Sequence, residues 1–206
     1  MNKKNIALVT GASTGIGEAL SRELVQRGYS VIGLARSLDK LTNMKNELGS
    51  TFIPIVCDVS SKLDIEKASQ QISKQNLCPS IFFLNAGMAG EKVIENPNAF
   101  KLEMHEKIMA VNYFGVLAFI ECWEKLCQEN GGANFIVTSS VNAIFAAPTG
   151  SAYCASKAAI SKAFESLSLT YFGTNLKFSS IYTGPVATDG LKGNWPFTCK
   201  PEKMAK

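Results

Sequence analysis

The chain has 206 residues, of which 46% are hydrophobic and 18% are charged, and its formal net charge is +4. This length and composition suit a packed globular protein, which we expect to form a single domain over residues 1–206. The basic residues are scattered along the chain, which argues against a nucleic-acid-binding surface. No apolar run is long enough for a signal peptide or a membrane span, so we expect a cytoplasmic protein.

The cysteines include no Cys-x-x-Cys pair, and the chain has a single histidine, so the spacing typical of zinc sites is absent. We therefore expect no metal ion and six reduced thiols, several of them packed as small hydrophobic side chains. The six are Cys57, Cys78, Cys122, Cys127, Cys154 and Cys199.

A glycine-rich turn joins the first expected strand to the first expected helix. Residues Ile6–Val9 are typical of a strand buried on both faces, and a helical stripe runs from Ile16 to Gly28. The spacing between them is Gly-x3-Gly-x-Gly, which lets a phosphate approach the backbone N–H groups at the helix start. We favour nucleotide binding over a plain turn. The residues expected to contact the nucleotide are Gly11, Ser13, Thr14, Gly15, Ile16 and Gly17.

The second expected strand, Ser30–Ala35, ends without the acidic residue that holds the ribose hydroxyl of NAD in many dinucleotide-binding proteins. Arg36 stands there instead, and an arginine can pair with the 2′-phosphate of NADP. The alternative is a solvent-facing arginine in front of the next helix, expected at 38–48. After the glycine turn we favour NADP over NAD. Ser37 is placed to add a hydroxyl to the phosphate site and to cap that helix.

A third strand is expected at Phe52–Val56, followed by Asp58 and Val59 at the edge where ligands bind in open α/β sheets. Asp58 is a candidate for contact with the adenine of a dinucleotide. It is equally a candidate for capping the next helix, expected at 64–75, and the sequence leaves both interpretations open.

The fourth expected strand, at 80–84, ends in Asn85, Ala86 and Gly87, whose small side chains let the backbone lie close to a cofactor. The next helix is expected from about 100 to 130, with a bend near 112–115. Asn112 is a polar residue inside an apolar stretch of it, and a buried asparagine needs partners. It serves either a structural hydrogen bond or a water held behind an active site. His105 has charged neighbours, so we expect it to be solvated.

The fifth expected strand, at 134–138, leads to Ser139 and Ser140 at the same edge, where a catalytic serine is expected. The helix expected over 152–171 carries Tyr153 and Lys157 four residues apart, which places both on one face. An ammonium beside a phenol lowers its pKa from about 10 and makes an acid/base that works near neutral pH. Taken alone, this spacing is weak evidence, because it more often means a half-buried tyrosine beside a solvated lysine.

A sixth strand is expected at 176–182, with a loop at 183–188 after it. Strands and helices thus alternate along the whole chain, which predicts an α/β fold with a doubly wound parallel sheet of about six strands and helices on both faces. The candidate site residues lie at or after the carboxyl ends of strands, where such sheets bind ligands.

In these segments the chain resembles the short-chain dehydrogenase/reductase family, over essentially its whole length to Thr188. The family's Thr-Gly-x-x-x-Gly-x-Gly turn matches Thr10–Gly17, its Asn-Ala-Gly matches Asn85–Gly87, and its Tyr-x-x-x-Lys matches Tyr153–Lys157. Ser140 has the spacing of the family's catalytic serine before the tyrosine.

The resemblance implies a role for each of these residues. Ser140 donates a hydrogen bond to the substrate oxygen, and Tyr153 exchanges a proton with that oxygen. Lys157 lowers the pKa of Tyr153 and holds the nicotinamide ribose, and Asn112 holds a water for proton relay. The remaining cofactor contacts that it implies are Asp58, Val59, Gly184, Val186 and Thr188.

The chain departs from the family pattern in four places. Leu84 and Ala143 replace a usual asparagine and glycine, and Thr183-Gly184 stands where the family has Pro-Gly. The chain stops at Lys206, about one helix and one strand early. Residues 201–206 look like the start of that helix, and the sixth strand becomes an edge with unpaired backbone groups.

We therefore expect an NADP-dependent oxidoreductase that moves a hydride between nicotinamide and a carbonyl or secondary alcohol, with reduction as the favoured direction. The alternative is a non-catalytic nucleotide-binding or interaction protein of the same fold. A homo-oligomer is expected through the two long helices, where Phe119, Trp123 and Phe164 are candidates, although each could equally belong to the core. Mostly apolar residues are expected to line the substrate pocket: Met88, Val141, Phe145, Ala146, Trp195 and Phe197.

Overall fold

The computed structural model describes residues 5–89, 101–147, 150–188 and 198–206. Six strands form one sheet in the order β3-β2-β1-β4-β5-β6, and all neighbouring strands are parallel. The strands are β1 Ile6–Thr10, β2 Ser30–Ala35, β3 Phe52–Val56, β4 Ile81–Leu84, β5 Ala133–Ser140 and β6 Leu176–Thr183. This order reverses between β1 and β4, which is the switch point of a doubly wound, Rossmann-like sheet and confirms the expected fold.

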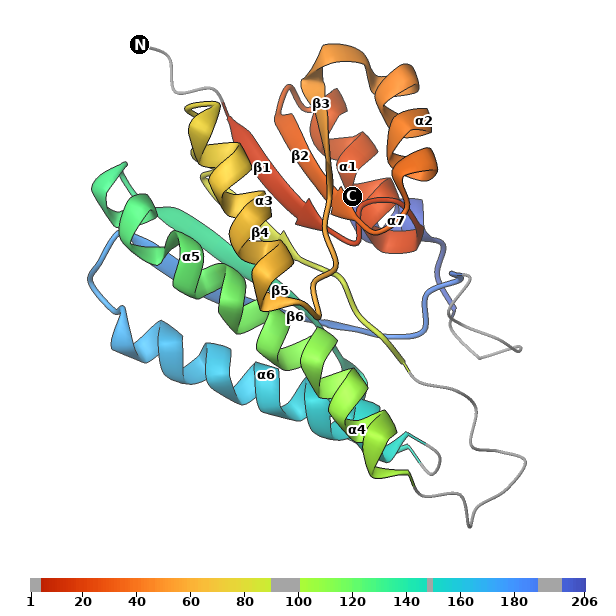
Figure 1. Ribbon diagram of the computed structural model, residues 1–206. Coiled ribbons are helices and arrows are strands. Elements are labelled where there is room, and N and C mark those ends of the chain that lie inside the picture. Colours follow the sequence, from red (N-terminus) through yellow and green to blue (C-terminus); the bar gives the residue numbers. More distant parts are fainter. Residues whose placement is uncertain (1–4, 90–100, 148–149, 189–197) are drawn as a thin grey trace.

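Helices cover the sheet from two sides (Figure 1). The helices are α1 Gly15–Gln26, α2 Leu38–Leu48, α3 Lys62–Lys74, α4 Leu102–Met109, α5 Gly115–Glu129, α6 Ser151–Thr170 and α7 Pro201–Ala205. One buried cluster joins the sheet to α3, α5 and α6, and a second joins it to α1 and α2. Among the described helices, none is long and apolar enough to cross a membrane.

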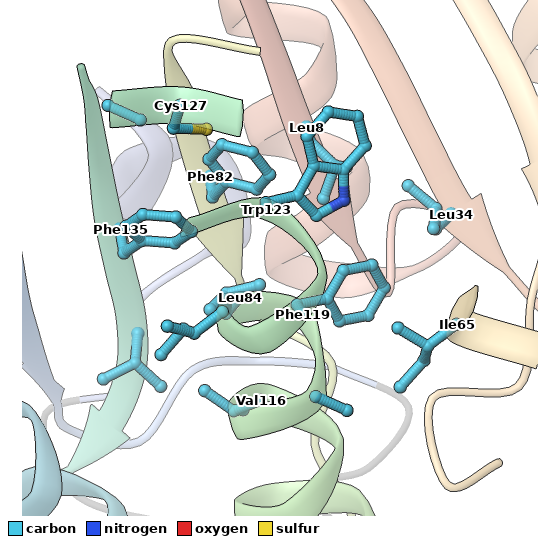
Figure 2. Close-up of a cluster of buried hydrophobic side chains, with 14 of the residues drawn as sticks. Leu8, Leu34, Ile65, Phe82, Leu84, Val116, Phe119, Trp123, Cys127 and Phe135 are labelled. Carbon is cyan, nitrogen blue, oxygen red and sulfur yellow. The ribbon is translucent and has the colours of Figure 1, made fainter. Parts of the chain in front are cut away.

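The larger of these two clusters is built around aromatic side chains of α5 and β4. Figure 2 shows Trp123 and Phe119 among Leu8, Phe82 and Ile65. The indole N–H of Trp123 donates a 3.0 Å hydrogen bond to Ser69 of α3, so its polar atom is satisfied. Three residues considered for an oligomer interface are therefore core residues, each at most 1% exposed: Phe119, Trp123 and Phe164.

The long helix expected from 100 to 130 consists of three pieces. A π-helical segment, Ala110–Phe114, separates α4 from α5, at the place where a bend was expected. Directly after it, Gly115 lies so close to the turn that follows β3 that an added Cβ would be 2.1 Å from the carbonyl oxygen of Val59. A glycine is therefore needed for this approach.

The β6 side of the sheet is less covered than the β1 side. Within the described part of the chain, β6 pairs only with β5, and Ile181 and Tyr182 on β6 are 39% and 45% exposed. The last helix, α7, instead packs on α1, which lies against β1 and β2 and not beside β6 (Figure 1). Pro201 occupies its first turn, and a helix at 201–206 was expected.

Candidate functional site

The glycine turn has the shape that an anion-binding loop needs. Gly11 and Gly15 have φ of +68° and +57°, which other residues rarely adopt. A Cβ at Gly17 would lie 2.2 Å from the carbonyl oxygen of Gly11, so the turn can close only with glycine there. Thr14 precedes α1 without capping it through its side chain, which leaves the N–H groups of the first turn available to an anion.

The turn after β4 packs directly against the glycine turn. The N–H of Ala86 donates to Oγ1 of Thr10 at 3.0 Å, and the side-chain amide of Asn85 donates to the Thr10 carbonyl at 3.3 Å. A Cβ on Gly11 would lie 3.0 Å from Cα of Ala86. The two predicted cofactor segments are therefore brought together. Thr10 holds them, although its hydroxyl was not singled out from the sequence.

Arg36 and Asp58 lie at the ends of the adjacent strands β2 and β3. Arg36 is exposed. Burial raises the pKa of Asp58, but two hydrogen bonds from Ser60, at 2.9 and 2.7 Å, and the charge of Arg36 outweigh it and hold the pKa below its usual value. The side chain that caps α3 belongs to Ser61, so the cap interpretation of Asp58 is wrong. Ser37 caps α2, as expected.

Ser140, Tyr153 and Lys157 meet at the carboxyl edge of β5. Ser140 is 6% exposed, and its hydroxyl oxygen accepts a 3.1 Å hydrogen bond from the N–H of Asn142. The same hydroxyl forms a hydrogen bond with the phenol of Tyr153. Helix α6 places Lys157 one turn further on, with Nζ 5.7 Å from the centre of the tyrosine ring.

The pKa of Tyr153 is raised, not lowered. Burial is the main cause, the neighbouring Cys154 adds to it, and the hydrogen bond with Ser140 opposes it. The expected lowering by Lys157 is wrong: Lys157 is not among the groups that shift the pKa of Tyr153, and its ammonium instead donates to the carbonyl of Thr138 at 2.7 Å. Burial also lowers the pKa of Lys157 to about 8.

Asn112 is 1% exposed and ties three elements together. Its Oδ1 accepts from the N–H of Met88 at 2.8 Å, and its Nδ2 donates to the Met88 carbonyl and to Oγ of Ser156, both at 2.9 Å. Both hydrogens of the Asn112 side-chain amide are thus hydrogen-bonded within the protein, as expected if Asn112 has a structural role. Next to it, a Cβ on Gly87 would lie 3.5 Å from this Oδ1 and 3.4 Å from Nζ of Lys157.

The loop after β6 returns to the glycine turn. Cys199 pairs with it through two backbone hydrogen bonds, to Pro185 at 3.0 Å and from Ala187 at 2.8 Å. The methyl group of Thr188 lies 2.8 Å from where a Cβ of Gly15 would be. The predicted contact Val186 is buried in this loop, and Gly184 is exposed.

The segment after Ser140 is apolar and open to solvent. Val141 is 37% and Phe145 is 70% exposed. Ile144 beside them, which was not expected to line the substrate pocket, is 65% exposed. Ala146 is exposed and Met88 is half-buried. Two other expected lining residues, Trp195 and Phe197, lie outside the described residues.

His105 is not the solvated residue that was expected. It is half-buried on α4, with Nε2 3.3 Å from the hydroxyl of Ser151 at the start of α6. In the described parts of the chain, no three His, Cys, Asp or Glu side chains are grouped so that they could hold a metal ion.

Comparison with known proteins gives related sequences and related folds. Residues 5–197 match the family model described as short chain dehydrogenase. An uncharacterised oxidoreductase of Mycobacterium bovis is 27% identical over 192 residues, which are 90% of this chain and 56% of that protein. This chain therefore spans little more than half the length of that relative.

Two solved structures share the fold. One is the 3-ketoacyl-(acyl-carrier-protein) reductase of Brucella melitensis complexed with NADH, with a TM-score of 0.89, 21% identity, and coverage of 98% of this chain and 87% of that one. The other is an alcohol dehydrogenase of the archaeon Thermococcus sibiricus complexed with 5-hydroxy-NADP, with a TM-score of 0.85, 26% identity, and the same coverage.

The match over residues 5–197 includes the glycine turn, the turn after β4 and the Ser140–Tyr153–Lys157 cluster. On this basis, the chain belongs to the short chain dehydrogenase family.

Proposed function

We propose that the protein is an NADP-dependent oxidoreductase that interconverts a carbonyl group and a secondary alcohol on a small, mainly apolar substrate. The observation that carries the proposal is the meeting of Ser140, Tyr153 and Lys157 beside a turn shaped to receive a phosphate. These groups can polarise an oxygen and exchange a proton with it.

The residues present fit a dinucleotide. The glycine turn leaves room for a pyrophosphate, because three positions are closed to side chains by φ or by contact, and the first turn of α1 is uncapped. When bound, the nicotinamide supplies or accepts the hydride. The residues that would hold the cofactor are Gly11, Ser13, Thr14, Gly15, Ile16, Gly17, Arg36, Asp58, Val59, Asn85, Ala86, Gly87, Tyr153, Lys157, Gly184, Val186 and Thr188.

The choice of NADP rests on Arg36. It is an exposed guanidinium at the end of β2, and its charge reaches Asp58 at the end of β3. A phosphate on the adenosine ribose would find a bidentate donor there. The archaeal alcohol dehydrogenase with 5-hydroxy-NADP is consistent with this choice, whereas the Brucella reductase with NADH shows that the fold also accepts the other cofactor.

The proton chemistry follows from the hydrogen bonds of the cluster. The Ser140 oxygen already accepts from the Asn142 N–H, so its own hydrogen can turn from the Tyr153 phenol to a substrate oxygen. The raised pKa of Tyr153 keeps its phenol protonated at neutral pH, as proton donation during reduction requires. The Lys157 ammonium, with its pKa near 8, is the buried group beside Gly87 that can exchange protons near neutrality, and Asn112 flanks it.

An apolar substrate and a homo-oligomer complete the proposal. The exposed side chains of Val141, Ile144 and Phe145 would cover an apolar group next to Ser140. Pairing between copies would use the outer face of the long helices, where Leu102 and Phe114 are 64% and 60% exposed.

Titration with NADPH and with NADH, followed by nicotinamide fluorescence, tests the cofactor assignment. We expect tighter binding of NADPH, and we expect Arg36→Ala to weaken NADPH by about tenfold, the effect of one charged hydrogen-bonding group, without weakening NADH. Arg27→Ala is the matched control, because Arg27 is an exposed arginine that pairs with Glu23 away from the turn. Equal affinity for both cofactors in the wild type would disprove the role of Arg36.

Turnover tests the chemistry. A panel of aliphatic and aromatic ketones with NADPH should give oxidation of the cofactor, and Tyr153→Phe should abolish this oxidation while the variant still binds NADPH. Cofactor binding without turnover of any ketone or alcohol would instead favour the non-catalytic nucleotide-binding alternative.

A further inference from the structure

A threonine at the end of β5 contacts two separate parts of the candidate site. Thr138 is half-buried; its carbonyl accepts the 2.7 Å hydrogen bond from Nζ of Lys157, and its hydroxyl donates a 3.1 Å hydrogen bond to Oδ1 of Asn85. From the sequence it was only the expected last residue of a strand. Its main chain and its side chain therefore serve different partners.

At one end of this connection, the buried Lys157 ammonium depends on the Thr138 carbonyl as its hydrogen-bond acceptor. Lys157 is 4% exposed, and in the described part of the chain no carboxylate lies within ion-pair distance of its ammonium. A buried ammonium needs an acceptor, and the structure gives it the carbonyl of Thr138. The position of that carbonyl thus determines where the ammonium rests beside Gly87.

The Asn85 end lies against the glycine turn. The carbonyl of Thr10 can only accept, so it takes an N–H of the Asn85 amide, and the amide oxygen is left facing the Thr138 hydroxyl. The same amide nitrogen would be 2.7 Å from a Cβ on Gly17 and 3.3 Å from one on Gly11. Asn85 therefore fills the space that these two glycines leave open.

We propose that Thr138 is a positioning residue that couples the phosphate-binding turn to Lys157. Its hydroxyl fixes Asn85 against the glycine turn, and its carbonyl fixes the Lys157 ammonium near the ring of Tyr153. The inference rests on the oxidoreductase function proposed above, because it links the two ends of that one site. Removal of the hydroxyl releases Asn85 at one end and moves the strand end that carries the carbonyl at the other.

The test compares Thr138→Val, which keeps the shape and loses the hydroxyl, with Thr138→Ser, which keeps the hydroxyl. The first readout is NADPH affinity. The second is the titration midpoint of Lys157 in the cofactor-free protein, followed by NMR of 13Cε-labelled lysine and assigned with Lys157→Met. We expect Thr138→Val to weaken NADPH binding about fivefold, the effect of one net hydrogen bond, and to displace the Lys157 midpoint. Thr138→Ser should match the wild type in both.

Thr183→Val is the matched control for loss of a buried hydroxyl. Thr183 lies on the neighbouring strand, is 7% exposed and donates to the Ser139 carbonyl at 3.1 Å, without contact to Asn85 or Lys157 in the hydrogen bonds of the described residues. We expect it to lower thermal stability and to leave the Lys157 midpoint unchanged.

Four results would overturn the coupling. In Thr138→Val, NADPH affinity and the Lys157 midpoint could both stay unchanged, or only one of them could change. Alternatively, Thr138→Ser could show the same changes as Thr138→Val, or the Lys157 midpoint could move equally in Thr183→Val. If the wild-type chain binds no nicotinamide cofactor, the proposed function fails. The Lys157 titration, which needs no cofactor, then still tests whether Thr138 positions the ammonium, and an unchanged midpoint in Thr138→Val overturns the proposal.

Discussion

At the scale of single residues, Lys157 lies in the candidate site, and the burial of its ammonium lowers the stability of the folded chain. It is 4% exposed, and burial alone accounts for its lowered pKa of about 8. One hydrogen bond to the Thr138 carbonyl does not replace the hydration of an ammonium. Strongly shifted pKa values at the edge of a sheet are typical of functional sites, where stability is given up for chemistry.

The pH dependence of folding should reveal this cost. A lysine pKa that falls from 10.5 to about 8 on folding removes about 3 kcal/mol from the free energy of unfolding below pH 8. Between pH 8 and pH 10.5 the folded chain has released the proton and the unfolded chain still binds it, so the stability contributed by this group rises with pH. Lys157→Met should therefore be more stable than the wild type at pH 7, and its advantage should shrink toward pH 10.

Urea unfolding at several pH values between 7 and 10 measures this difference. Lys162→Met is the control, because Lys162 is an exposed lysine on the same helix that pairs with Glu165. Its unfolding free energy should run parallel to that of the wild type. A difference between Lys157→Met and wild type that stays constant with pH would contradict the prediction.

From the sequence, the side chains that form the site could be predicted well, but the groups that those side chains contact could not. The spacing of Ser140, Tyr153 and Lys157 was sufficient to expect a cluster, because strand ends and helix turns have fixed geometry. The Thr138 carbonyl and the backbone of Met88 were not predictable as partners. Backbone groups carry no residue-specific signal, and burial, which reverses the expected shift in the pKa of Tyr153, depends on the whole packed molecule.

At the scale of elements, the approach of α5 to the sheet edge depends on a glycine. Sequence patterns predicted each strand and helix to within a few residues, since apolar runs and periodic stripes are local signals. The π-helical segment between α4 and α5 was expected only as a bend. Its cause lies in tertiary contacts: Asn112 bonds to Met88, and Gly115 lies on the Val59 carbonyl.

Gly115→Ala should push α5 away from the turn at 58–60. The new methyl carbon would lie 2.1 Å from a backbone oxygen, which cannot yield as a flexible side chain can. We expect a loss of about 1–3 kcal/mol in the free energy of unfolding, together with weaker NADPH binding through Asp58 and Val59. In Gly150→Ala, the added carbon would meet atoms no closer than 3.6 Å, so its unfolding free energy should change much less. Equal losses in both variants, measured by urea unfolding, would refute the steric explanation.

Asn112→Ala should loosen the turn that carries Gly87 and Met88. The substitution leaves both backbone groups of the half-buried Met88 without their partner; an unsatisfied group costs about 1–3 kcal/mol when fully buried, so we expect a loss near the lower end of that range for each. Hydrogen exchange at the Met88 amide should accelerate along with the fall in stability. Asn130→Ala serves as the exposed control, because Asn130 donates to a carbonyl at the end of α5. A protected Met88 amide in Asn112→Ala would show that the turn is held by other contacts.

At the scale of the whole molecule, the sheet is well covered around β1 and β2 and more exposed toward β6, one of its two edge strands. Parallel sheets are normally covered on both faces, and an uncovered edge strand offers unpaired backbone groups to other chains. Here β6 has one partner strand among those described, and apolar Ile181 and Tyr182 are partly exposed on it. Leu102 on α4 and Phe114 just before α5 are separate exposed apolar side chains on the long helices. If copies of the chain associate through each of these places, we expect the two modes to behave differently.

Association through the helices should be discrete, because helix faces can pair once around a two-fold axis and then close. Association through the β6 edge should continue to grow with concentration, since strand pairing by an exposed edge is unspecific in register.

We expect Phe114→Glu to convert a defined oligomer into a smaller species, and Ile181→Lys to suppress large, concentration-dependent species while leaving the defined oligomer intact. Sedimentation velocity over a range of protein concentrations separates the two effects. Leu63→Lys, at a 58% exposed leucine on α3, controls for the added charge. If Ile181→Lys dissolved the defined oligomer, or Phe114→Glu removed only the large species, the assignment of the two surfaces would be reversed, and the β6 edge would be the specific interface.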